Sequence, residues 1–158
     1  MITKKPLQLL GIVILLSTSF IILPTESKAA YWGVRAGSYT DMDDFFIGGE
    51  FLSKMNRDFY FNPNIEYVFV EKATYITFNF DLRYNLITNR SSYLWCGGGI
   101  GALYFDPEIE GFDSETDMGV NLLLGFGART RNKIKPYIQG KFILGDNDEF
   151  VLGVGVRF

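Results

Sequence analysis

The feature of this sequence that most constrains its fold is a regular alternation of apolar and polar residues from residue 31 onward. Successive side chains of a β-strand point to opposite faces, so a period of two predicts strands. The clearest example is the stretch 74–86, where Phe78 and Phe80 alternate with Asn79 and Asp81. No stretch of this part of the chain has convincing helical spacing. We therefore expect it to be built from strands.

Eight stretches carry this pattern, and each is about ten residues long. They are 31–39, 45–53, 59–70, 74–86, 92–105, 118–130, 136–144 and 149–158. The connections between them are mostly short, which is typical of an up-and-down antiparallel sheet. Closing such a sheet into a barrel pairs its two exposed edge strands with each other. The sequence therefore predicts an all-β fold, an eight-stranded antiparallel up-and-down β-barrel.

The apolar face of such a barrel points inward in a water-soluble barrel and outward in a membrane barrel. The interior of an eight-stranded barrel is just wide enough for side chains to fill it. The apolar face carries twelve aromatic rings, too many for that interior: Phe51, Phe59, Phe61, Tyr67, Phe69, Phe78, Phe80, Tyr84, Phe126, Phe142, Phe150 and Phe158. We therefore expect this face to point outward, into lipid.

The composition and length of the strands agree with a transmembrane barrel. Glycine weakens a strand unless a neighbouring group needs the space, as in a crowded interior. The polar face carries seven glycines: Gly33, Gly37, Gly48, Gly125, Gly127, Gly153 and Gly155. About ten residues at about 3.3 Å each, tilted by about 40°, rise roughly 25 Å, the height of the apolar band of an outer-membrane barrel.

This orientation turns nine charged residues toward the lumen, and they are the candidate site residues. They are Arg35, Glu50, Glu66, Asp81, Arg83, Arg129, Lys141, Glu149 and Arg157. Buried charges need partners, so the near balance of five basic and four acidic residues favours paired charges that fill the interior. A narrow conducting path through the lumen is the alternative.

Two stretches fit the alternation less well. Pro63 stands inside a predicted strand, where it removes one hydrogen bond of the ladder and implies a bulge. Three consecutive glycines at 97–99 interrupt the alternation, so it is less clear which residues of the stretch 92–105 face outward and which face inward. For that stretch we expect five residues to face lipid: Leu94, Cys96, Ile100, Ala102 and Tyr104.

The first 29 residues differ in character from the rest. Two lysines precede an apolar stretch over 9–23, and Ser27-Lys28-Ala29 fits the small-x-small cleavage rule. These features predict a signal peptide at 1–29 and a barrel domain at 30–158. An uncleaved membrane anchor is the alternative, although an apolar stretch of about fifteen residues is short for a membrane-spanning helix.

The whole pattern resembles that of the small eight-stranded outer-membrane β-barrels, the group that contains the transmembrane domain of outer-membrane protein A and its porin-like relatives. The resemblance covers 30–158, and its most specific part is the ending Leu152-x-Val154-x-Val156-x-Phe158. In that family a last strand ending on Phe is the signal read by the barrel-assembly machinery. The resemblance thus implies that Leu152, Val154, Val156 and Phe158 form an assembly signal. An ordinary edge strand that ends on Phe is the alternative.

The same resemblance implies a Gram-negative outer membrane, contact with its lipid, and periplasmic termini. The connections divide by charge: those near 40–44, 71–73, 106–117 and 145–148 are acidic, and those near 54–58, 87–91 and 131–135 are basic. Up-and-down topology places the two sets at opposite ends, so the acidic end is expected to face outside. Solubility at both rims is the plainer explanation of the charges.

The longest acidic connection partly matches a calcium-binding loop. Asp106, Glu108, Glu110, Gly111 and Asp117 fall at positions 1, 3, 5, 6 and 12 of that motif. Glutamates stand where Asp or Asn is usual, the twelfth residue is Asp, and no flanking helices are apparent. We therefore expect weak binding of divalent cations by clustered acids and no dedicated metal site.

The sequence offers no sign of a catalytic site. It contains no histidine, the base on which familiar outer-membrane hydrolases and acyltransferases rely, and Cys96 has no evident partner base. The net charge of −3 gives no indication of a nucleic-acid partner. We expect a non-enzymatic outer-membrane barrel without a cofactor, with a structural or surface-contact role. The alternative is a secreted water-soluble barrel that binds a small apolar ligand.

Overall fold

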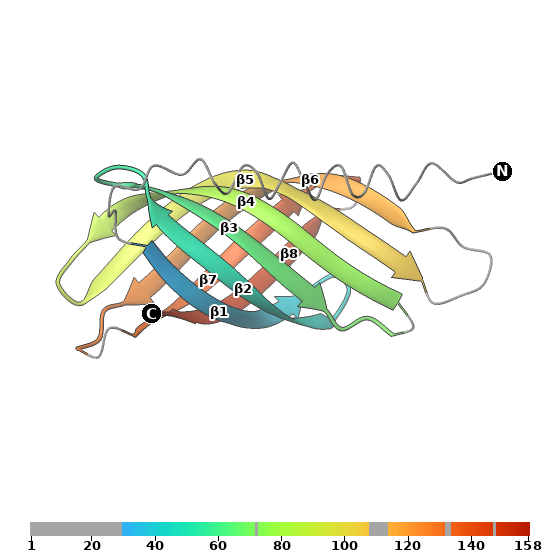
Figure 1. Cartoon of the computed structure of the whole chain (residues 1–158), viewed down its shortest axis with the longest axis horizontal. Helices are drawn as coiled ribbons and strands as arrows, with labels where there is room; N and C mark the ends of the chain where they lie inside the picture. Colours follow the sequence, from blue (N-terminus) through green and yellow to red (C-terminus); the bar gives the residue numbers. More distant parts are fainter. Residues whose placement is uncertain (1–29, 72, 108–113, 132–133, 147) are drawn as a thin grey trace.

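The computed structural model describes residues 30–158 except 72, 108–113, 132–133 and 147, and these residues form a closed antiparallel β-barrel. The strands follow one another around the barrel in chain order, and β8 pairs with β1 (Figure 1). They are β1 (Ala30–Tyr39), β2 (Asp44–Lys54), β3 (Phe59–Val68), β4 (Ala73–Thr88), β5 (Ser92–Pro107), β6 (Glu115–Ala128), β7 (Lys135–Leu144) and β8 (Glu149–Arg157). The predicted signal peptide, 1–29, lies outside the described residues.

Each of the eight predicted stretches forms one strand, so the predicted all-β, up-and-down barrel is confirmed. The differences lie at the strand ends, where β6 starts at Glu115 and β4 continues to Thr88. The end of the barrel with the C-terminus, on the left in Figure 1, also carries the connections 55–58 and 89–91. In the part of the chain that is described, no helix is long and apolar enough to cross a membrane.

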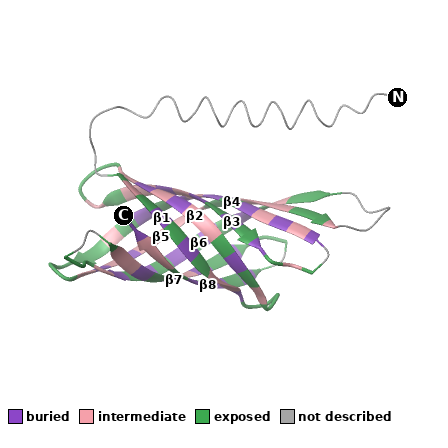
Figure 2. Ribbon diagram, turned by 60° about the horizontal axis from the view of Figure 1, so that its bottom comes forward, coloured by how far each residue is buried: buried purple, intermediate pink, exposed green. Residues whose placement is uncertain are grey.

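Burial alternates along the strands, least regularly in β5, and it has the sense expected for a membrane barrel (Figure 2). Phe45 is 70% exposed, whereas its neighbour Phe46 is 2% exposed. None of the twelve rings predicted to face outward is buried in the barrel. Charged and amide side chains fill the middle of the interior, and buried aromatic and aliphatic side chains lie toward its two ends. The burial is therefore the reverse of that in a water-soluble barrel with an apolar core, and it contradicts that alternative.

The fifth strand follows the predicted parity. Tyr93 and Trp95 point into the barrel, at 7% and 0% exposure, and Ile100 lies on the outer face with 53% exposure. Ala102 pairs with the outward Phe78 and Cys96 with the outward Tyr84, which places both of them on the outer face.

The predicted bulge at Pro63 is wrong. The register between β2 and β3 is the same on both sides of Pro63, with Glu50 opposite Asn64 and Ser53 opposite Phe61. The side chain of Asn62 explains why the strands stay aligned, because its Nδ2 donates a hydrogen bond of 3.1 Å to the carbonyl oxygen of Phe51. Phe51 is the residue opposite Pro63 in this register, so an amide side chain supplies a donor where proline has none.

Candidate functional site

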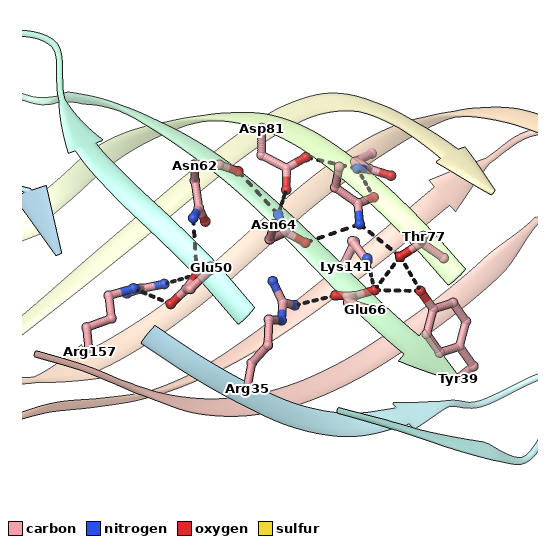
Figure 3. A network of polar contacts seen from close by, with 12 residues as sticks. Arg35, Tyr39, Glu50, Asn62, Asn64, Glu66, Thr77, Asp81, Lys141 and Arg157 are labelled. Carbon is pink, nitrogen blue, oxygen red and sulfur yellow. Dashed lines mark hydrogen bonds and ion pairs between the residues drawn. The ribbon is translucent and has the colours of Figure 1, made fainter. Parts of the chain in front are cut away.

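The centre of the lumen is a hydrogen-bonded network around the carboxylate of Glu66 on β3 (Figure 3). Glu66 forms ion pairs with Lys141 Nζ at 2.7 Å and with Arg35 Nη2 at 3.1 Å. It also accepts hydrogen bonds from the hydroxyl of Tyr39 at 2.6 Å and from that of Thr77 at 3.1 Å. Three strands besides β3 thus converge on one buried acid, which satisfies the rule that buried charges are paired and hydrogen-bonded.

A second ion pair lies nearer the end that carries the C-terminus. Arg157 on β8 donates from Nε to Glu50 Oε1 at 2.6 Å and from Nη2 to Oε2 at 3.1 Å, the two-pronged geometry that suits a guanidinium and a carboxylate. Asn62 Nδ2 donates to the same carboxylate at 3.1 Å. Glu50 is therefore held by residues from two other strands, β3 and β8.

Amide side chains connect the two ion-pair clusters. Asp81 accepts hydrogen bonds of 2.9 Å from Asn64 and from Asn121. Asn79 donates to Asn64 at 3.1 Å and to Thr77 at 3.0 Å. Short amides on the inward face of neighbouring strands lie within hydrogen-bonding distance of one another, so they link the charged residues across the barrel.

Apolar residues close the lumen at the end with the acidic connections. Six buried side chains form this cluster, which we call the apolar plug: Tyr39, Phe46, Val68, Tyr75, Ile143 and Val151. The ring of Tyr39 meets those of Phe46 and Tyr75 edge to face, at centroid distances of 5.7 Å and 6.0 Å. Aromatic pairs in this geometry pack well, so the plug separates the polar network from that end of the barrel.

An aromatic cluster of Tyr93, Trp95 and Tyr137 fills the other end of the lumen. Two guanidinium groups lie on these rings: that of Arg83 is 3.9 Å from the Trp95 centroid, and that of Arg157 is 3.8 Å from the Tyr137 centroid. These are cation–π contacts, which compensate in part for burying a positive charge.

Glycines opposite the large inward side chains make room for them. Trp95 pairs across the strands with Gly125, Tyr93 with Gly127 and Tyr137 with Gly155. A Cβ atom at Gly155 would lie 2.5 Å from the ring of Tyr137, and one at Gly125 would overlap the indole. The inward glycines are therefore required by packing, as expected from their position on the face predicted to line a crowded interior.

The structure places eight of the nine predicted lumen charges in the interior, four basic and four acidic. Arg129 is the exception and is corrected: it follows the last residue of β6, Ala128, and its side chain lies at the mouth of the lumen and is not buried inside it, although its backbone nitrogen still donates a hydrogen bond of 2.8 Å to the carbonyl oxygen of Ser91. It is exposed, with its guanidinium 5.9 Å from the ring of Tyr93. Glu149 lies near the acidic end and accepts a hydrogen bond of 2.9 Å from the backbone of Asp41.

Six neutral polar residues of the interior were not among the predicted site residues. They are Asn62, Asn64, Thr77, Asn79, Asn121 and Gln139. Their signal was present in the sequence, since each of them alternates with outward apolar neighbours. They were missed because the predicted site residues were restricted to charged side chains.

The residues of the predicted assembly signal lie along the outer face of β8. Leu152, Val154 and Phe158 are 45–58% exposed, and Val156 is partly buried. The backbone nitrogen of Phe158 donates a hydrogen bond of 2.8 Å to the carbonyl oxygen of Trp32. This bond extends the pairing of β8 with β1 to the last residue.

The acidic and basic connections lie at opposite ends of the barrel, as strand order requires. Asp106 and Asp117 of the calcium-loop match stand at the ends of β5 and β6, whereas Glu108, Glu110 and Gly111 lie outside the described residues. Among the residues that are described, no group of three or more acidic or cysteine side chains is arranged to hold a metal ion.

No protein-family model matches the sequence, and no curated protein matches it. Solved structures match its fold. The N-terminal β-barrel domain of Pseudomonas aeruginosa OprF superposes with a TM-score of 0.71 at 12% identity, covering 84% of this chain and 98% of that one. Neisserial surface protein A gives 0.69 at 14% identity, with the same two coverages. The outer-membrane enzyme PagL gives 0.57 at 9% identity, covering 81% and 98%.

Proposed function

We propose that this chain, which has the fold of the small eight-stranded outer-membrane β-barrels, is a non-enzymatic outer-membrane protein with a structural or surface-contact role. The observation that carries the proposal is the filled lumen. Eight buried charges of balanced sign, neutral amides and an apolar plug occupy the interior of the described barrel. A barrel filled in this way presents only its outer wall and its two ends to other molecules.

The distribution of charge supports a membrane location. Arg35, Arg83, Lys141 and Arg157 are all at most 2% exposed inside the barrel. Facing lipid near the bilayer midplane, each would cost about 2–4 kcal/mol. Together that cost would rival the whole stability of a typical domain, about 5–15 kcal/mol. The orientation of the strands is therefore strongly determined if the outer face meets lipid.

Two observations support a role without catalysis. The chain has no histidine, the residue most often used for general acid–base catalysis. Its interior acids are engaged in ion pairs or hydrogen bonds within the barrel, as for Glu50, Glu66 and Asp81. PagL shares this fold and is an enzyme, so the fold alone does not decide the point.

The two ends of the barrel support a surface-contact role. Nine acidic residues that are described lie at the end with the apolar plug: Asp41, Asp43, Asp44, Glu71, Asp106, Glu115, Asp117, Asp146 and Asp148. Periplasmic termini would direct this end outward, where it would attract cationic partners or divalent ions.

Fractionation tests the membrane location, and cysteine labelling tests the orientation. We expect the protein to stay with the cell envelope after osmotic shock, to run as a heat-modifiable band, and to begin at Ala30 after export. The native Cys96 is first replaced by alanine, and a single cysteine is then introduced as Asp43→Cys or as Arg57→Cys. A membrane-impermeant maleimide applied to intact cells should label the Asp43→Cys protein alone. Release by osmotic shock, or labelling of Arg57→Cys alone, would contradict the proposal.

A further inference from the structure

The end of the barrel that carries the C-terminus contains a cavity of about 280 Å³, which we call the basic cup. It lies where the strands begin or end, and all of its charged lining residues that are described are basic. These are Lys54, Arg83, Arg129, Lys135 and Arg157. Its volume is near the lower end of the range for small-molecule sites, about 300–1,000 Å³.

Arg83 at the floor of the cup is a buried cation without an ion pair among the described residues. It is 1% exposed, and its Nε and Nη1 atoms have no hydrogen-bond partner. The three other buried cations are each paired with a carboxylate: Arg35 and Lys141 with Glu66, and Arg157 with Glu50. A buried charge without a partner is costly, so an anion bound from outside the chain would stabilise Arg83.

Two buried acids of the barrel, Asp81 and Glu50, are engaged with other residues. Asp81, two residues before Arg83 on the same strand, accepts hydrogen bonds from Asn64 and Asn121. Glu50 accepts two hydrogen bonds from the Arg157 guanidinium, as Figure 3 shows. Among the described residues neither of these carboxylates forms an ion pair with Arg83, although the charge of Glu50 acts on it through space.

The remaining lining residues suit a phosphate group. Arginine presents a planar set of N–H donors that match phosphate oxygens, and lysine contributes a mobile positive charge. Tyr31, Tyr60 and Tyr93 add hydroxyl groups that donate hydrogen bonds, and Asn85 adds an amide. Charges of one sign around a cavity with low-dielectric walls also raise the local concentration of counter-ions.

We infer that the basic cup binds the phosphate group of a small soluble molecule, with Arg83 as its principal ligand. The cup lies inside the ring of strands, and lipid headgroups surround the outer wall, so a soluble phosphate ester reaches it more directly than a phospholipid does. The apolar plug lies at the opposite end of the lumen. The ligand therefore enters and leaves by the mouth of the cup.

Titration calorimetry on the full-length protein, isolated from membranes in an uncharged maltoside detergent, tests this inference. The probes are inorganic phosphate, glycerol 3-phosphate, and phosphatidylglycerol in mixed micelles. We expect one saturable site for the soluble phosphates. Arg83→Gln should weaken it about 10- to 100-fold, the effect of losing a charged hydrogen bond. Arg131→Gln, which removes an exposed charge outside the cup, should leave the affinity unchanged.

Lys135→Gln provides a second variant, because it alters the partly exposed rim of the cup and leaves the buried floor in place. We expect it to weaken binding several-fold while the heat-modifiable band is retained. The inference would be overturned if Lys135→Gln left the binding affinity unchanged. It would also be overturned if Arg131→Gln lowered the affinity as much as Lys135→Gln does. Absence of saturable binding by every probe would also overturn it. Binding to phosphatidylglycerol alone would refute the soluble ligand and assign the cup to a lipid headgroup.

Discussion

Arg157 and Arg83 are equally buried but differ in their partners, so replacing each by methionine should have different effects on the free energy of unfolding. Arg157 makes two hydrogen bonds to Glu50, of 2.6 Å and 3.1 Å. The Arg157→Met variant leaves that buried carboxylate without its counter-ion. Breaking a buried ion pair from one side costs about 3–5 kcal/mol. We therefore expect Arg157→Met to lose about that much of the free energy of unfolding.

Arg83→Met removes a cation that has no carboxylate partner among the described residues. The change forfeits the contact at 3.9 Å with the Trp95 ring, worth about 0.5–2 kcal/mol. It also removes the cost of burying a charge, which is several kcal/mol. Methionine is flexible and packs well against aromatic rings. The free energy of unfolding should therefore stay the same or rise by about 1–3 kcal/mol.

Urea unfolding in detergent micelles, without added phosphate, measures both changes. Tryptophan fluorescence follows the loss of structure, and heat-modifiable gel mobility provides an independent probe. Adding Glu50→Gln to Arg157→Met removes the unpaired charge and should recover most of the loss. Equal losses from Arg83→Met and Arg157→Met would refute the reasoning, because the two buried arginines would then have equivalent environments.

Three further changes test the packing, the lipid face and the assembly signal. Gly125→Ala places a Cβ against the Trp95 indole and should lower the free energy of unfolding by about 1–3 kcal/mol. The control is Gly49→Ala, where the added Cβ meets open space, and it should change the free energy of unfolding by less than about 0.5 kcal/mol. Leu122→Arg turns a charge toward lipid and should cost about 2–4 kcal/mol in vesicles; no loss relative to Leu122→Ile would contradict a lipid-facing β6. Deletion of Phe158 should abolish the heat-modifiable band in outer-membrane fractions, and normal insertion without it would remove the assembly role of the C-terminal strand.

The strands could be predicted from the sequence because each residue of this barrel meets either the outside or the interior. Phe78 is 42% exposed and the next residue, Asn79, is 2% exposed. This contrast repeats along most of the strands, and it arises from neighbouring residues without any contribution from distant parts of the chain. Local sequence therefore determines which residues form strands and which face each side chain takes. It leaves the strand ends less certain, and that uncertainty explains why Arg129 is exposed at the mouth of the lumen and not buried in it.

The packing of the side chains inside the lumen could not be predicted in the same way, because it depends on which residues lie opposite each other. Phe46 and Trp95 are aromatic, yet the parity of their strands turns them inward. Their space comes from Gly37 and Gly125, which become their neighbours only once the register of the sheet is known. The same holds for Pro63, whose missing donor is replaced by a side chain from the preceding residue.

The positions of the plug and the cup together determine what the interior is able to do. A lumen that served as a passage would need small or polar side chains at both ends, whereas Tyr39, Phe46 and Tyr75 pack against one another at the acidic end. The unpaired Arg83 lies toward the opposite end, beside a cavity without a described acidic lining residue. A solute that reaches Arg83 would have to pass the ion pairs of both Glu50 and Glu66 before it met the plug. We therefore expect binding at the cup without solute flux, and vesicles containing the protein should retain a trapped phosphate ester as well as empty vesicles do.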